Sequence, residues 1–219
     1  MPRALFEKTG KAIYISHLDL MRLFQRAFKR AGLHLTHTQG YSPRPSVSIA
    51  LPMSVGLESH CELLDFDLDG ETISCEEIKE RLNQTLSEGV RILEVYPHTR
   101  KIGAIAYLDC TVTMEYDHVV PADAIQRLSN LFGRDEILVE KTNRNGTVQQ
   151  NIIPMIRALD ISAVGGHIIR LQARVCCQNP TLNPMQLIAA ISNEIPELTP
   201  DFTACCRNEI YDAEESVFR

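Results

Sequence analysis

Apolar side chains recur every three or four residues between Ser16 and Gly32, and cationic side chains share the opposite face of this segment. The apolar positions are Leu20, Phe24, Ala27, Phe28 and Ala31. This spacing predicts an amphipathic helix. Ser16, with Asp19 three residues later, is a typical helix start, and Gly32 is typical of a helix end.

The rest of the first hundred residues shows mainly the alternation of apolar and polar positions that is typical of strands. The predicted strands are residues 4–7, 12–15, 46–51, 61–68 and 90–95. A second helix is predicted over residues 74–86, with Ser74 as its cap. The main elements follow the order strand, helix, strand, strand, helix, strand, which is that of a ferredoxin-like domain.

The second half of the chain repeats this order with additions. Pro121 opens a predicted helix, the run NRNG at 143–146 indicates a hairpin, and Gly165-Gly166 indicates a turn. Strands are predicted over residues 104–116, 136–141, 147–153, 156–161, 167–177 and 204–210, and helices over 121–131 and 183–195. We therefore predict an α+β chain of two tandem ferredoxin-like (βαββαβ) domains with antiparallel sheets, residues 1–99 and 100–219. The second domain is elaborated by an extra hairpin.

Composition agrees with a folded, soluble protein. Hydrophobic residues make up 44% of the 219 residues and charged residues 23%, which are ordinary values for globular domains. No apolar run approaches the ~20 residues that cross a bilayer. The N-terminus has no apolar segment behind Arg3, so no signal peptide is expected. We expect a cytoplasmic protein that does not bind a membrane.

The cysteines do not have the spacing of metal ligands. No CxxC motif and no cysteine triplet of an iron–sulfur protein occurs, and adjacent residues of a strand face opposite sides of it. An odd number of cysteines without a secretion signal favours reduced, buried thiols. The seven are Cys61, Cys75, Cys110, Cys176, Cys177, Cys205 and Cys206. We expect no bound metal and no cofactor.

The net charge of −6 is unevenly distributed along the chain. Residues 1–60 contain eight Lys or Arg residues against three acids, whereas the remainder contains 14 bases and 25 acids. A basic patch on an acidic body suits a polyanion such as RNA. The cationic face of the first predicted helix consists of Arg22, Arg26, Lys29 and Arg30. These side chains are candidate phosphate contacts, and a solvated helix face without a ligand is the alternative.

The loop after this helix, QGYSPRP at 39–45, is stiffened by two prolines and carries two candidate binding residues. Arg44 adds a cation next to the helix. Tyr41 is a candidate to stack on an unpaired base, and the alternative is a loop aromatic that folds onto the core.

Three histidines of the same region are candidates for chemistry. His17 lies in the first helical turn, where the helix dipole favours a neutral imidazole that could act as a general base. A hydrogen-bonded structural histidine is the alternative. His34 and His37 are three residues apart, but no carboxylate or thiol follows at ligand spacing, so the pattern gives little support for a metal site.

The runs YISHLDLMRLFQRAFKRAGL and QGYSPRPSVSIALPMSVG resemble the bacterial radical-SAM-linked protein family, a domain of unknown function found alone or fused to B12-binding radical-SAM proteins. The resemblance is dense over residues 3–70 and looser to about residue 210. In this family the loop more often has Asn, His and Lys where this chain has Ser42, Arg44 and Ser46, so chemistry that depends on that histidine is not expected here. The resemblance implies association with a radical-SAM enzyme that modifies RNA or protein.

The chain lacks the cysteine spacing of a radical-SAM enzyme, so it cannot be the catalyst by itself. The leading hypothesis is an RNA-binding accessory module that presents tRNA or rRNA to a radical-SAM modification enzyme. A second hypothesis is a metal-independent endoribonuclease of tandem ferredoxin-like architecture, with His17 or His37 as acid and base and Arg44 stabilising developing charge. The third is a protein–protein adapter that uses the acidic second half.

Overall fold

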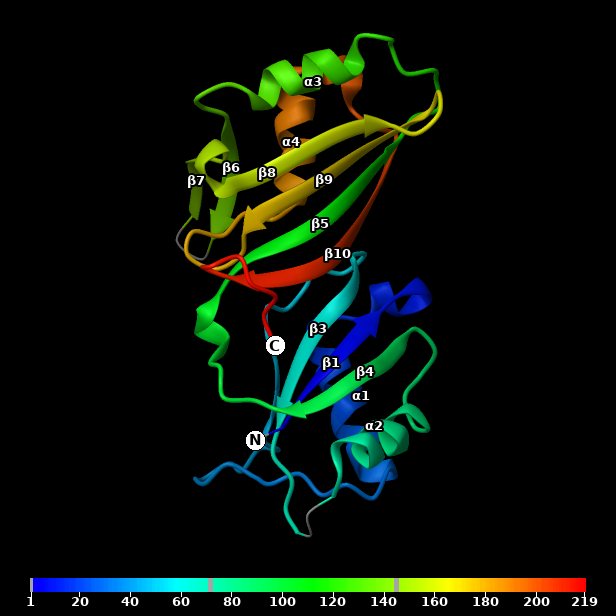
Figure 1. Cartoon of the computed structure of the whole chain (residues 1–219), viewed down its shortest axis with the longest axis vertical. Helices are drawn as coiled ribbons and strands as arrows, with labels where there is room; N and C mark the ends of the chain where they lie inside the picture. Colours follow the sequence, from blue (N-terminus) through cyan, green and yellow to red (C-terminus); the bar gives the residue numbers. More distant parts are fainter. Residues whose placement is uncertain (1, 71–72, 144–145) are drawn as a thin grey trace. The chain divides into compact units, whose positions relative to one another are not determined.

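The structure is a computed structural model that describes residues 2–70, 73–143 and 146–219. It has an α+β fold that divides into two compact units (Figure 1). The first unit comprises the residues up to Ile102 together with Arg219, and the second comprises Gly103–Phe218.

The first unit is an antiparallel sheet covered by two helices on one face. Strand β1 (Pro2–Lys8) pairs with β3 (Glu58–Phe66) on one side and β4 (Val90–Pro97) on the other. The short strand β2 (Val47–Ile49) pairs with the outer side of β3. Helix α1 (His17–Arg30) follows β1, and helix α2 (Cys75–Asn83) follows β3.

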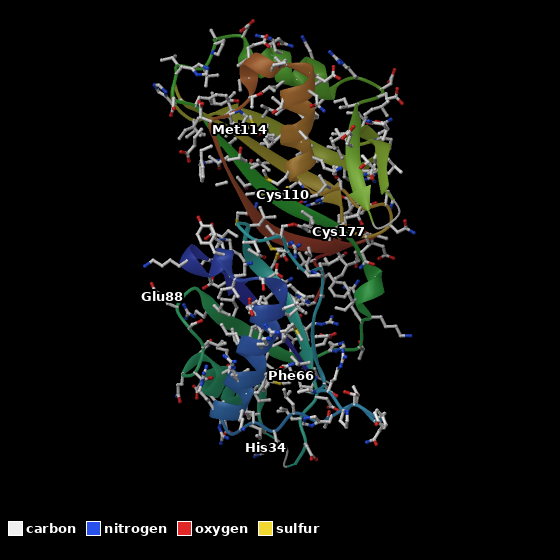
Figure 2. All side chains as sticks on the ribbon, turned by 180° about the vertical axis from the view of Figure 1, so that it is seen from behind. His34, Phe66, Glu88, Cys110, Met114 and Cys177 are labelled. Atoms are coloured by element: carbon white, nitrogen blue, oxygen red, sulfur yellow. The ribbon has the colours of Figure 1, made fainter. Side chains whose placement is uncertain are left out.

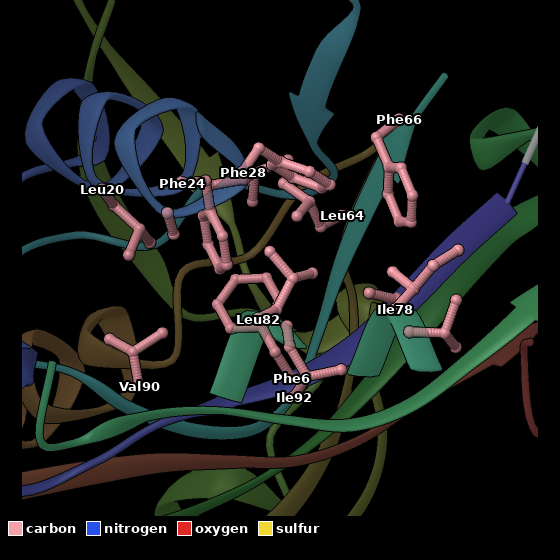
Figure 3. Packing of buried hydrophobic residues seen from close by; sticks show 14 of the residues in the cluster. Phe6, Leu20, Phe24, Phe28, Leu64, Phe66, Ile78, Leu82, Val90 and Ile92 are labelled. Carbon is pink, nitrogen blue, oxygen red and sulfur yellow. The ribbon is translucent and has the colours of Figure 1, made fainter. Parts of the chain in front are cut away.

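Aromatic and aliphatic side chains fill the space between these helices and the sheet (Figure 3). The rings of Phe6 and Phe24 meet edge to face at 4.9 Å between centroids, and those of Phe28 and Phe66 meet at the same distance. All four residues are fully buried. The predicted apolar face of α1 therefore forms this core, as Leu20, Phe24, Ala27 and Phe28 are its buried residues. Burial of such side chains is the main favourable term in folding.

The predicted strand at 12–15 is wrong, because this segment is a 3₁₀ helix, η1 (Gly10–Tyr14). Gly10 adopts a positive φ of 54°, and the amide of Ala12 donates to the carbonyl of Thr9 at 3.1 Å. The backbone therefore turns before a strand can form. Short apolar runs do not distinguish a strand from a helical turn.

The second unit contains a four-stranded antiparallel sheet. Strand β5 (Ile105–Glu115) pairs with β10 (Phe202–Asp212) and with β9 (Ile168–Cys176), and β9 pairs with β8 (Ile156–Ala163). Strands β6 (Leu138–Asn143) and β7 (Gly146–Asn151) form a separate hairpin, and the predicted turn residues Arg144 and Asn145 lie outside the described residues. The remaining elements are helices α3 (Ala124–Phe132) and α4 (Met185–Glu194) and the 3₁₀ helices η2 (Ile102–Ala104), η3 (Ile153–Met155) and η4 (Pro196–Leu198).

Several element ends differ from the sequence prediction for local reasons. Strand β2 ends at Ile49, and Leu51 soon after it takes a positive φ of 46°. Helix α2 ends at Asn83, whose side chain exchanges two hydrogen bonds with the backbone of Ile92, at 2.8 and 2.9 Å. Helix α3 begins at Ala124 rather than Pro121, whose carbonyl accepts from the amide of Ala124 in a preceding turn.

Within the described residues, no helix combines the length and the apolar character needed to cross a membrane.

Candidate nucleic-acid interface

Helix α1 begins at a cap that was expected from the sequence. The hydroxyl of Ser16 accepts from the amide of Asp19 at 3.2 Å and donates to its carboxylate at 2.8 Å. Arg22 also donates to the Asp19 carboxylate, at 2.9 Å. The hydrogen bonds that the Asp19 carboxylate accepts from Ser16 and Arg22 hold the pKa of Asp19 below its ordinary value, and that from Ser16 has the larger effect. The cap therefore fixes a carboxylate at the start of the basic face.

The basic face of α1 does not form one continuous stripe. Arg22, Arg26 and Arg30 lie on one side of the helix at intervals of four residues. They line a hollow of about 510 Å³, which we call the arginine hollow. Its other lining residues are Ile15, Asp19, Leu23 and Ser87. Arg26 donates no hydrogen bond to the described residues and lowers the pKa of Asp19 only through space. Arg30 donates to the backbone carbonyl of Thr85 at 2.7 Å, so its hydrogen-bond partner there is a neutral group.

Lys29 lies in a second hollow, of about 320 Å³, on the other side of the last turns of α1. We call it the histidine hollow because it brings His34 and His37 together. Its lining residues are Gln25, Phe28, Lys29, Leu33, His34, Leu35, His37 and Pro45. The predicted set of four helix cations is thus divided between two sites.

The loop at 38–44 projects from the residues that follow α1, and its neck is closed by backbone hydrogen bonds. The amide of Thr38 donates to the carbonyl of Arg44 at 2.9 Å, and the amide of Arg44 donates to the Thr38 hydroxyl at 3.1 Å. Tyr41 lies at the tip and is fully exposed. The alternative prediction that this ring folds onto the core is therefore wrong.

The candidate catalytic histidines are not brought together. His17 is the first residue of α1, whereas His37 lies after the end of the helix and lines the histidine hollow with residues of its last turns. His37 instead forms a bridge with Pro45, which places it beside Arg44 at the neck of the loop. Among the described residues, no group of three His, Cys, Asp or Glu side chains could hold a metal ion.

The structure refines the charge asymmetry, because two of the eight N-terminal cations are buried. Arg3 is fully buried, and Lys8 donates from its buried ammonium to the Ile15 carbonyl at 3.4 Å. Carboxylates pair with exposed or half-buried arginines elsewhere in the chain. The pairs are Arg81 with Glu77, Arg127 with Glu197, Arg134 with Glu194, Arg157 with Glu215, and Arg174 with Asp109 and Glu215. Among the lining residues of the arginine hollow, by contrast, Asp19 is the sole carboxylate.

Sequence reasoning missed a polar cluster in the first unit. Strand pairing places Arg3 opposite both Asp65 and Tyr96. The imidazole of His98 lies 3.7 Å from the Asp65 carboxylate, and neither ring nitrogen has a hydrogen-bond partner among the described residues. Burial raises the pKa of Tyr96. Only the pairing of strands distant in sequence could reveal this cluster.

The cysteines are free thiols that are buried or half-buried. In each adjacent pair one member is buried and the other is half-buried, as expected for neighbours on a strand: Cys177 and Cys205 are the buried members. Cys110 and Cys205 share a hydrogen bond, which together with burial raises the pKa of Cys110. Such buried thiols behave as small apolar side chains in the core of the second unit.

Comparison with known proteins gave a family match over most of the sequence. The sequence profile of the family described as "Uncharacterized protein conserved in bacteria (DUF2344)" matches residues 2–184. No curated protein matches. A solved structure described as "Crystal Structure of an Unknown Protein from Galdieria sulphuraria" matches with 11% identity over 94% of this chain and 96% of that chain. Its TM-score of 0.26 is too low to support an argument about fold. Because the profile covers most of the sequence, the chain belongs to the DUF2344 family of uncharacterized bacterial proteins.

Proposed function

We propose that this protein is an RNA-binding accessory module that presents tRNA or rRNA to a radical-SAM modification enzyme. The observation that carries the proposal is the arginine hollow. Three exposed arginines line it, and Asp19 is the sole carboxylate in its lining. Guanidinium groups bind phosphate through paired hydrogen bonds, which makes arginine well suited to this contact.

The spacing of the arginines matches an extended polyanion. Successive members are four residues apart, so each lies about 6 Å further along the helix, and Arg22 and Arg30 are about 12 Å apart. Neighbouring phosphates of a nucleic acid strand recur on a similar scale. A single small anion would engage only part of such a row.

The loop at 38–44 supplies groups for contacts with bases. Tyr41 is fully exposed at its tip, and the exposed side chain of Arg44 makes no hydrogen bond or ion pair within the described residues. An exposed tyrosine ring can stack on an unpaired base of any sequence. The arginine hollow would thus provide affinity and the loop would provide base contacts.

The partner is proposed from the resemblance of residues 3–70 to the radical-SAM-linked proteins. A B12-binding radical-SAM enzyme would carry out the chemistry, and this chain would hold the substrate in the cytoplasm. The lack of cysteine ligands in the sequence is consistent with this division of labour.

We further infer that each unit is a ferredoxin-like domain. In the first unit the antiparallel strand order β4-β1-β3-β2, with a helix after β1 and after β3, supports this assignment. The second unit supports it with the order β10-β5-β9-β8 and helices after β5 and β9, the β6–β7 hairpin being an insertion. One fold serves many functions, so this inference does not bear on RNA binding.

A metal-independent endoribonuclease is the second candidate. The position of His37 beside Arg44 at the neck of the loop favours it. There His37 would transfer a proton while Arg44 stabilises the charge that develops on a phosphate. His17, at the far end of α1, would have no part in this arrangement.

The test measures binding of a fluorescently labelled single-stranded RNA, with and without EDTA, over a series of salt concentrations. We expect binding without cleavage and an affinity that falls with salt, by a slope of about −0.7 per phosphate contact. Arg26→Gln should weaken binding and reduce that slope by about one contact. The matched control is Arg91→Gln, which removes an exposed arginine of β4 outside both hollows.

Two outcomes would contradict the proposal that this protein is an RNA-binding module acting through the arginine hollow. If Arg26→Gln leaves both the affinity and the salt slope of RNA binding unchanged, the arginine hollow is only a solvated helix face. If the RNA is cut in the presence of EDTA and His37→Ala abolishes the cut, the protein is the endoribonuclease.

A further inference from the structure

The histidine hollow combines an apolar floor with a polar rim. Phe28 and Leu33 are buried residues that form the floor together with the half-buried Leu35 and Pro45. Lys29, His34 and His37 are exposed, and they form the rim with Gln25. Figure 2 shows His34 just beyond the end of α1. A mostly apolar concave site with a few polar groups is the usual form of a small-ligand site.

The charges of the rim select the ligand. The lining contains one permanent cation, Lys29, and two histidines that become cationic on protonation, whereas no carboxylate lines the hollow. An anionic group is therefore favoured at the rim and an apolar planar group on the floor.

We propose that the histidine hollow holds one unpaired nucleotide, with its base on the floor and its phosphate at Lys29. The volume of about 320 Å³ is at the lower end of small-ligand sites and suits one nucleotide rather than a longer segment. Gln25 can donate to or accept from the edge of a base. The rim histidines supply donors to the phosphate.

The inference rests on the proposed function, since the nucleotide would belong to the same RNA. Lys29 is adjacent to Arg30 in the helix, so an RNA strand on the arginine hollow passes close to the histidine hollow. The closed neck of the loop at 38–44 forms part of the same site through His37 and Pro45. An RNA bound across α1 could thus place its phosphates on one side of the helix and one displaced base on the other.

The test uses ribonucleoside 5′-monophosphates, which do not depend on RNA binding. Each is titrated into the ¹⁵N-labelled full chain and followed by NMR, with inorganic phosphate and free nucleosides as separate ligands. We expect saturable shifts at Gln25, Lys29, His34 and Leu35 with the nucleotides. Affinity should be at least about tenfold lower for either half alone and for Lys29→Gln, as expected for loss of a charged hydrogen bond. Lys29→Arg should retain binding, and so should the control Lys11→Gln, which alters an exposed lysine outside the hollow.

Two results would overturn the inference. One is the absence of nucleotide-induced shifts at the histidine hollow. The other is an equal response to inorganic phosphate alone, which would make Lys29 a simple anion contact at the end of the helix. Failure of the proposed function would be seen in a different experiment. The wild-type protein would then not bind RNA, whether or not it binds the free nucleotides.

Discussion

The buried guanidinium of Arg3 donates hydrogen bonds to both carboxylate oxygens of Asp65, at 2.6 Å from Nε and 2.9 Å from Nη2. The two residues face each other across strands β1 and β3. Arg3 also donates to the Arg100 carbonyl at 3.2 Å. Arg3 therefore links the first strand to Asp65, about sixty residues later, and to the backbone of Arg100, about a hundred residues later.

Asp65→Asn should destabilise the protein by about 3–5 kcal/mol, because it removes one partner of a buried ion pair. Chemical denaturation monitored by circular dichroism measures this change in the free energy of unfolding. Asp69→Asn is the control, since it alters an exposed carboxylate just after β3 and should stay within about 0.5 kcal/mol of wild type. Equal stability of the two variants would show that the Arg3–Asp65 pair adds no net stability.

Ser16→Ala should raise the pKa of Asp19 towards its ordinary value, because the hydroxyl of Ser16 is the main cause of the lowered pKa. The folded pKa of Asp19 is lowered, so the carboxylate stabilises the fold above its ordinary pKa, and that contribution is lost as the pH falls through the folded pKa. An NMR titration of the carboxyl carbon measures the change. Loss of the cap should also cost about 0.5–2 kcal/mol.

The control for this experiment is Ser74→Ala. Ser74 caps α2 by accepting from the amide of Glu77 at 3.2 Å. Its replacement should lower stability by a similar amount and leave the titration of Asp19 unchanged. A lowered Asp19 pKa that persists in Ser16→Ala would assign the effect to Arg22 instead.

Tyr41→Ala should weaken RNA binding by about 1–3 kcal/mol, the usual value for base stacking on an aromatic side chain. Because the ring is fully exposed, the melting temperature should not change. Fluorescence anisotropy with single-stranded RNA and differential scanning calorimetry give the two values. Tyr41→Phe keeps the ring and should keep the affinity, and equal losses in both variants would point to the hydroxyl rather than to stacking.

Gly89→Ala should be far more damaging than Gly32→Ala. Both glycines have a positive φ, 84° and 68°, which disfavours any side chain. At Gly89 an added Cβ would also lie 2.4 Å from the Thr9 carbonyl oxygen and 2.8 Å from the Cβ of Ala12, whereas the space at Gly32 is open. Thermal unfolding of the two variants provides the comparison, and similar melting temperatures would show that the backbone around η1 can move aside.

The sequence by itself determined the elements whose signals are local. The apolar spacing of residues 20–28 predicted α1, because side chains three and four apart share one helix face. Ser16 and Ser74 predicted both helix starts of the first unit, and Gly32 predicted the end of α1, where its amide donates back to the Lys29 carbonyl at 3.3 Å. Such caps act within four residues, so neighbours in the sequence suffice to identify them.

The tertiary structure decided what the candidate site contains. The sequence placed Lys29 with Arg30 on one basic face, but in the fold they line different hollows. Arg30 shares its hollow with Ile15 and Ser87, and Lys29 shares the other with residues 33–45. Likewise, Arg3 looked like part of a basic surface until strand pairing buried it against Asp65. The physical reason is the same in both cases: burial and charge pairing depend on which distant segments meet, and a local pattern of residues does not carry that information.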